Sequence, residues 1–121
     1  MKILQIIQKP QFRGAEIFAC QLSEHLIDLG HEVVVVTLIN DPSTSLPFSV
    51  PFLTLNANLK RRFWDFKAYK RLNDLIVDGH YDLVQANAAD TLKYASISKI
   101  LFGWKAKLVF RNANKMGDFL T

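Results

Sequence analysis

The chain has 121 residues, half of them hydrophobic, with 15 Lys or Arg, 11 Asp or Glu and a single cysteine. This length and apolar content predict one folded domain with a real core and exclude a disordered chain. The formal charge of +4 is too small for a nucleic-acid-binding protein, and one cysteine cannot form an internal disulfide or a cysteine metal cluster.

The first third of the chain predicts a βαβ unit. Residues 3–7, interrupted only by Gln5, and residues 33–36 are apolar without the alternation of a half-exposed strand, which is typical of parallel strands buried on both faces. Between them a helix is indicated by apolar residues at steps of three and four, and Gly30 supplies the left-handed stop after it. We expect Cys20 to be a small buried hydrophobe within this helix. The stripe expected to face the sheet consists of Ala15, Phe18, Ala19, Leu22 and Leu26.

The rest of the chain alternates strands and helices. Residues 40–45 consist of turn-forming residues, and Pro51 then opens a short edge strand. The predicted elements that follow are a strand at 52–55, a helix at 65–77, a strand at 81–86, a helix at 89–101 and a strand at 107–110. The helix at 65–77 is expected to face the core through Phe66, Tyr69, Leu72, Leu75 and Ile76.

This alternation predicts an α/β fold, a Rossmann-like three-layer sandwich with a parallel sheet in the strand order 3-2-1-4-5. Ligands of such sheets bind at the carboxyl ends of the strands, where the strand order reverses. Residues 9–14 and 87–90 should therefore lie side by side at the reversal between the first and fourth strands.

Several common sites are missing from the sequence. A dinucleotide site needs three spaced glycines, whereas the first turn, residues 8–14, contains only Gly14. Phosphate-loop and nucleophile-elbow motifs are absent, and His25, His31 and His80 are too scattered to bind a metal. We therefore expect neither a cofactor nor a metal, and we interpret the histidines as solvated or turn residues.

Gly14 stands at the start of the first helix, where free backbone N–H groups and the positive helix end favour an anion such as a diphosphate. A plainer interpretation is that Gly14 only eases the turn while Glu16 complements the helix dipole. Spacing alone leaves both interpretations open.

The order of these motifs resembles the N-terminal half of GT-B glycosyltransferases, especially glycosyltransferase family 4, over nearly the whole chain. The matching motifs are Gly14-Ala15-Glu16, Gly30-His31-Glu32-Val33 and Tyr81-Asp82-Leu83-Val84. The resemblance implies two Rossmann-like domains facing each other across a cleft, with the acceptor on the first domain and the nucleotide-sugar on the second. Residues 1–121 would then be one acceptor-side domain, inactive without its donor domain.

The resemblance also implies what the parent enzyme does. It would be a hexosyltransferase, retaining and metal-free, that transfers a sugar from a nucleotide-sugar to a glycan or lipid-linked glycan in cell-envelope polysaccharide synthesis. No apolar run is long enough to span a bilayer, so we expect a cytoplasmic protein, peripheral to the inner face of the membrane.

Carried over residue by residue, the resemblance places the donor phosphates at Arg13, Gly14 and Glu16. The family commonly has a second glycine where this chain has Arg13, which either adds a charge-assisted contact or obstructs the backbone.

The acceptor side is implied at the ends of the fourth and fifth strands, at Asn87, Arg111, Asn112 and Asn114. Many relatives have His-x-His where this chain has Gln85-Ala86-Asn87, so Asn87 either binds an acceptor sugar or caps the next helix. Arg111 either grips a phosphate or sugar carboxylate, or is a solvated arginine. The asparagines suit sugar hydroxyls or turns.

Basic and aromatic residues mix in the segment Lys60, Arg61, Arg62, Trp64 and Lys67. Such a mixture suits an anionic membrane surface, and family members with lipid-linked acceptors use comparable patches. The alternative is a solvated helix face with Phe63 or Trp64 folded into the core. A rival for the whole chain is a free-standing flavodoxin-like module that holds a small anion or a protein partner without chemistry.

Overall fold

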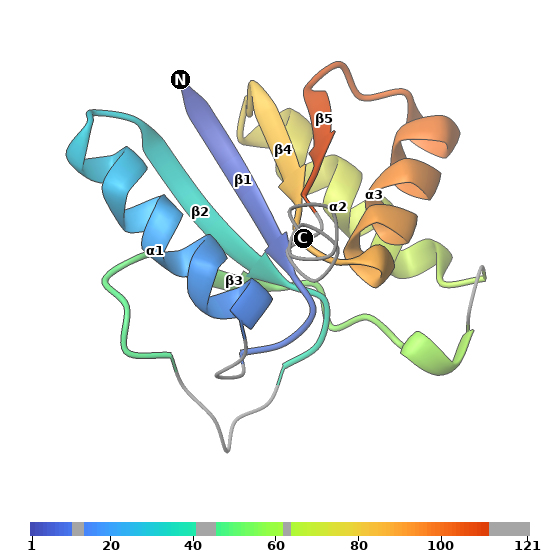
Figure 1. Ribbon diagram of the computed structural model, residues 1–121. Helices are drawn as coiled ribbons and strands as arrows, with labels where there is room; N and C mark the ends of the chain where they lie inside the picture. The colour runs from blue at the N-terminus through green and yellow to red at the C-terminus, as the bar shows by residue number, and fades with distance from the viewer. Residues whose placement is uncertain (11–13, 41–45, 62–63, 112–121) are drawn as a thin grey trace, which may run out of the picture.

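The computed structural model of the chain describes residues 1–10, 14–40, 46–61 and 64–111 (Figure 1). Its elements, in chain order, are β1 (Lys2–Ile7), α1 (Gly14–Asp28), β2 (Glu32–Thr37), β3 (Phe52–Thr54), the short 3-10 helix η1 (Leu59–Arg61), α2 (Phe66–Asp78), β4 (Leu83–Ala86), α3 (Ala89–Phe102) and β5 (Lys107–Phe110).

The strands form one parallel sheet in the order β3-β2-β1-β4-β5, which confirms the predicted fold class and strand order (Figure 1). Gln5 of β1 pairs with Val35 on one side and Gln85 on the other. The order reverses between β1 and β4, so the loops that leave these two strands meet at the carboxyl edge of the sheet.

Helix α1 packs on one face of the sheet, whereas α2 and α3 cover the other (Figure 1). Successive side chains of a strand point to opposite faces, which divides β1 between two cores. Leu4 and Ile6 join the core beneath α2 and α3, which includes Tyr69 and Tyr94. Ile7 joins the core beneath α1. Gln5, which alternates with Leu4 and Ile6, therefore lies on the α1 side of the sheet.

The face of helix α1 that packs against the sheet differs from the predicted one. Its buried residues are Glu16, Ala19, Cys20 and Ser23, whereas Phe18, predicted to face the sheet, is 45% exposed. Apolar residues occur all around this helix, so their spacing did not fix which side faces inward. Ser23 fits the inner face because its hydroxyl donates a hydrogen bond to the Ala19 carbonyl at 2.7 Å. The prediction that Cys20 is buried is confirmed.

Helix α2 buries Tyr69, Leu72 and Ile76 as predicted, but the prediction for Phe66 was wrong because this ring is 48% exposed. Phe66 is the first residue of the helix and lies at the rim of the core. Its ring makes edge contacts with Trp64, 5.9 Å between centroids, and with Tyr69, 6.0 Å away.

The element boundaries follow the turn chemistry of the sequence. Gly30 and Gly103 come just after α1 and α3 with φ of 98° and 69°, as a left-handed stop requires. Strand β4 begins two residues later than predicted, at Leu83, and the preceding Asp82 accepts a hydrogen bond from the Lys2 amide through its carboxylate. Among the described residues, the helices are all too short or too polar to cross a membrane.

Candidate functional site

Two loops meet at the carboxyl edge of the sheet, at the predicted reversal of strand order. The Gln8 side-chain amide, just after β1, donates to the Asp90 carboxylate at the start of α3 over 2.9 Å. The Asn87 backbone amide, just after β4, donates to the Ile6 carbonyl at 3.2 Å. The ends of β1 and β4 thus meet at the predicted reversal through Ile6 and Gln8, whereas residues 11–13 of the predicted segment 9–14 lie outside the described residues.

Asn87 is buried between these strands, and both ends of its side chain are engaged. Its Nδ2 donates to Gln5 Oε1 at 2.9 Å and to the Ile6 carbonyl at 3.1 Å. Its Oδ1 accepts from Gln85 Nε2 at 3.1 Å and from Arg111 Nε at 3.4 Å. Because its polar atoms already have protein partners, Asn87 organises neighbouring side chains and offers no free group to a sugar.

The alternative role for Asn87, capping the next helix, was wrong. The N-cap position of α3 is Ala88, whose backbone amide donates to Thr91 Oγ1 at 2.9 Å. The same hydroxyl donates to the Ala88 carbonyl at 2.7 Å, which closes the first turn without an asparagine. Thr91 is the third residue of α3, and its hydroxyl accepts from the N-cap backbone amide, the contact that a glutamate or glutamine makes in a capping box.

Arg111 follows β5 and turns back over the α1 side of the sheet. Its backbone amide donates to the Ala86 carbonyl, and its half-buried guanidinium lies on the ring of Phe18, with Cζ 3.8 Å from the ring centroid. Burial lowers the pKa of Arg111, although a guanidinium stays charged at neutral pH. Nη2 is shielded from solvent and has no hydrogen-bond partner in the described part of the chain.

The first turn of α1 lies beside this stack. Gly14 is exposed, and a Cβ built on it would meet no atom within 4 Å. Residues four apart share one side of a helix, so Gly14 and Phe18 point the same way. Glu16 is instead buried on the face that carries Cys20, and its place in the first turn is the one that the helix dipole favours for an acid.

A hollow of about 260 Å³ opens at the carboxyl ends of β2 and β3. Sequence reasoning missed it, although threonines at the ends of two neighbouring strands were a usable signal. Apolar walls with a few hydroxyl and amide groups suit a sugar or another small neutral group. The lining residues are Pro10, Thr37, Asn40, Leu46, Phe52, Leu53 and Thr54.

Three of the predicted site residues, Arg13, Asn112 and Asn114, lie outside the described residues, and so does Arg62 of the basic segment. The described part of the chain contains no cluster of three His, Cys, Asp or Glu side chains able to hold a metal ion. What it brings together is a helix N-terminus, a stacked arginine and a hollow along one edge of the sheet. These groups can bind an anion and a neutral group side by side.

The basic segment lies elsewhere, around the start of α2. Lys60, Arg61, Trp64 and Lys67 are all exposed, and Trp64 has 69% of its surface open, so this indole is not folded into the core. The alternative of a buried Trp64 was therefore wrong, and Phe63 is outside the described residues.

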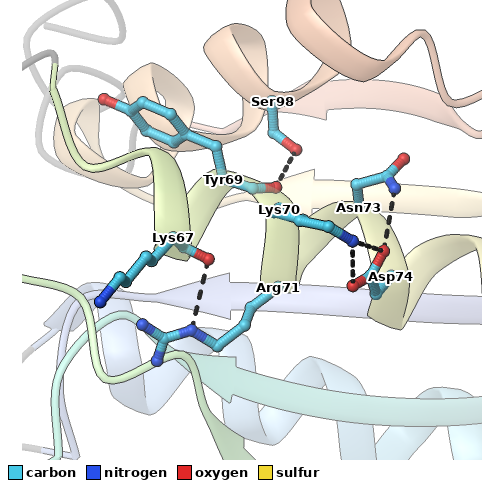
Figure 2. Close-up of polar contacts among 7 residues, drawn as sticks. All are labelled: Lys67, Tyr69, Lys70, Arg71, Asn73, Asp74 and Ser98. Atoms are coloured by element: carbon cyan, nitrogen blue, oxygen red, sulfur yellow. Dashed lines mark hydrogen bonds and ion pairs between the residues drawn. The ribbon is translucent and has the colours of Figure 1, made fainter.

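Two cations further along α2 are already engaged. Lys70 pairs with Asp74 at 3.0 Å, and Arg71 Nε donates to the Lys67 carbonyl (Figure 2). Arg71 Nη1 also donates to the Leu55 carbonyl. The Lys67 side chain extends away from Lys70 and Asp74 in the same view. Phe66 and Phe102 flank the cations across a shallow hollow of about 520 Å³.

Known proteins were compared with the chain. No curated protein matches it. Sucrose-phosphate synthase from Thermosynechococcus elongatus superposes with a TM-score of 0.68 at 15% identity, over 99% of this chain and 35% of that one. Anabaena HepE, in complex with UDP and glucose, gives a TM-score of 0.58 at 19% identity, over 91% of this chain and 29% of that one. The chain thus spans about a third of the length of these two proteins, and the likeness concerns the fold.

The family comparison covers most of the chain. The model of glycosyltransferase family 4 matches residues 12–112, a span that runs from the loop before α1 to the end of β5 and includes Gly14, Asn87 and Arg111. By sequence as well as by fold, the chain belongs to glycosyltransferase family 4.

Proposed function

We propose that this chain is the acceptor-side domain of an enzyme that transfers a sugar from a nucleotide-sugar to a glycan or lipid-linked glycan. A second domain would hold the donor, and residues 1–121 alone would bind the acceptor without catalysing transfer. Family membership supports the proposal, and the HepE structure, which is a complex with UDP and glucose, is consistent with such a donor.

The observation that carries the proposal is the exposed first turn of α1. Transfer releases a nucleoside diphosphate, whose negative charge must be stabilised as the glycosidic bond breaks. The backbone N–H groups of a first helical turn have no acceptor within the helix, so they and the positive helix end favour such an anion, and Gly14 leaves room for its approach. The hollow at β2 and β3 would take a sugar of the acceptor.

Finer features of the proposal come from the family resemblance. The parent enzyme would transfer a hexose with retention of configuration and without a metal, in the assembly of cell-envelope polysaccharide. It would work in the cytoplasm, where nucleotide-sugars are made. Arg13, Asn112 and Asn114 remain proposed contacts of the donor phosphates and the acceptor.

The proposal is tested by transfer activity of the full-length protein with a panel of nucleotide-sugars. Gly14→Val is expected to lower kcat/KM by about 10- to 100-fold, because a branched side chain would occupy the approach of the diphosphate to the backbone. The protein fold should persist, since a Cβ at position 14 meets nothing within 4 Å.

Gln21→Val is the matched control, because it places the same branched residue at an exposed site on the same side of α1. It should retain the activity of the unaltered protein. Equal losses in the two variants would assign the effect to any branched side chain on this side of α1 and remove Gly14 from the site. A full-length protein that neither transfers nor binds any nucleotide-sugar would favour the free-standing binding module.

We further propose that Lys60, Arg61, Trp64 and Lys67, named here the basic patch, rest on an anionic membrane surface, with Arg62 as a further member. The supporting observation is that an open indole and unburied cations share the start of α2. Indoles settle at the lipid interface, and each lysine near an anionic surface contributes about 1 kcal/mol to binding. A lipid-linked acceptor would be presented at this surface.

Tryptophan fluorescence tests the basic patch directly. The chain has two tryptophans, and Trp104 is 3% exposed, so a blue shift on adding vesicles reports Trp64. We expect this shift with vesicles that contain phosphatidylglycerol and none with pure phosphatidylcholine. Lys67→Glu should weaken binding about tenfold, because it replaces attraction by repulsion. Lys105→Glu, an exposed lysine outside the patch, is the control, and equal losses would reduce the effect to net charge.

A further inference from the structure

The side chain of Arg111 is oriented from two directions, and its terminal nitrogen Nη2 is buried without a hydrogen-bond partner in the described part of the chain. The ring of Phe18 lies against one face of the guanidinium, 3.8 Å from Cζ, and Asn87 Oδ1 accepts a hydrogen bond from Nε at 3.4 Å. Nη2 has no partner within the described ranges, and neither of the ion pairs found there includes Arg111. The guanidinium is therefore held in place without being neutralised.

The residues that hold Arg111 are themselves fixed. Asn87 is buried and is held by Gln5, which is fully buried and paired with Gln85 across the strands. Gln5 also keeps one amide nitrogen, Nε2, without a partner in the part of the chain that the structure describes. A buried donor without an acceptor is costly, by about 1 to 3 kcal/mol, so unpaired donors at two neighbours of Asn87 need an explanation.

We propose that Arg111 is a receptor for a carboxylate or phosphate group of the substrate, and that Phe18 is the positioning residue that presents its guanidinium. The identity of this anion as a substrate group rests on the proposed transferase function. A planar fork that is oriented in advance matches either anion with two parallel hydrogen bonds. A ligand of this kind would supply the acceptor that Nη2 lacks.

The position of the stack supports this assignment. Phe18 lies one turn beyond Gly14 on the same side of α1, so the guanidinium that stacks on its ring lies toward the N-terminal end of this helix, where the helix dipole is positive. Both features attract negative charge, whereas Glu16 is buried on the other face of the helix. The Phe18 ring is 45% exposed, so a ligand that covered it would remove apolar surface from water, which is favourable.

The test follows the side-chain Nε–H signal of Arg111 by NMR in the full chain while anions are added at constant ionic strength. Pyrophosphate represents a phosphate source, glucuronate represents an acidic sugar, and glucose is the neutral control. We expect saturable shifts with at least one of the two anions and none with glucose. A response to pyrophosphate alone would assign the subsite to a diphosphate, and a response to glucuronate alone would assign it to an acidic acceptor.

Variants separate positioning from folding. Arg111→Gln, which lacks the Nε–H signal and is followed instead through the backbone amide signals of α1, should abolish the binding. Phe18→Leu should weaken it about fivefold, whereas Phe18→Tyr, which keeps the ring, should bind like the original chain. Phe66→Leu, an exposed phenylalanine on α2, is the matched control and should leave binding unchanged. The proposal is overturned if neither anion shifts the Arg111 signal, or if Arg111→Gln binds as well as the original chain. Because no sugar transfer is measured, its failure is distinguishable from failure of the transferase proposal.

Discussion

Asn87→Ala is expected to lower the free energy of unfolding by about 3 kcal/mol, because it removes the partner that holds a buried neighbour. Gln5 is fully buried, and the one hydrogen bond of its side chain among the described residues comes from Asn87 at 2.9 Å. The substitution would leave both polar ends of that side chain without a partner, and it would also release Arg111 Nε. Urea unfolding followed by far-UV circular dichroism measures the change.

Asn73→Ala is the matched control, since Asn73 is a partly exposed asparagine whose amide donates to the neighbouring Asp74 at 3.2 Å (Figure 2). It should change the free energy of unfolding by less than about 1 kcal/mol. The double variant Gln5→Met with Asn87→Ala should recover part of the loss, because it removes both members of the buried pair. A loss below about 1 kcal/mol for Asn87→Ala alone would contradict this account of the network.

Asp65→Ala is expected to cost about 2 to 4 kcal/mol, because this buried carboxylate joins three parts of the chain. Its Oδ2 accepts a hydrogen bond from the Tyr94 hydroxyl at 2.9 Å and from the Asn58 backbone amide at 2.6 Å. Burial first, and then the Asp65 carboxylate, raise the pKa of Tyr94, so the phenol remains a donor well into the alkaline range. Thermal and urea unfolding of the variant measure the loss.

The control for this prediction is Asp74→Ala on the outer side of α2. Asp74 pairs with Lys70 in solvent, so its removal should be far less costly than that of Asp65 (Figure 2). Tyr94→Phe completes a double-mutant cycle with Asp65→Ala, in which we expect the two losses to be strongly coupled. Additive losses would mean that the hydrogen bond between these side chains contributes little.

The fold was predictable because each element carries a local signal. Apolar runs without alternation indicated buried parallel strands, and Gly30 and Gly103 ended their helices in the left-handed conformation. The inward side of α1 was not predictable in the same way. Ile17, Phe18 and Leu22 give that helix apolar residues on several sides. Packing against the sheet therefore selects the buried face, and Ser23 can lie on it because its hydroxyl donates to the Ala19 carbonyl of the same helix.

The site was predictable by position but not by contact. The strand order predicted from the sequence places Gly14, Asn87 and Arg111 at one edge of the sheet. Hydrogen bonds such as the one between Gln5 and Asn87 join residues 82 positions apart, and no local spacing encodes them. The stack of Phe18 on Arg111 also depends on the turn of α1 about its axis, which the sequence left ambiguous.

The burial of Cys20 makes the chain convenient to label. It is the one cysteine of the sequence, it is buried on the inner face of α1, and burial, aided by Glu24 and Glu16, raises the pKa of its thiol to about 12. A thiol that stays protonated is a poor nucleophile, so maleimide dyes have little to react with on the native protein. A cysteine introduced on the surface would thus carry a fluorophore at a single known point, and the native thiol need not be removed first.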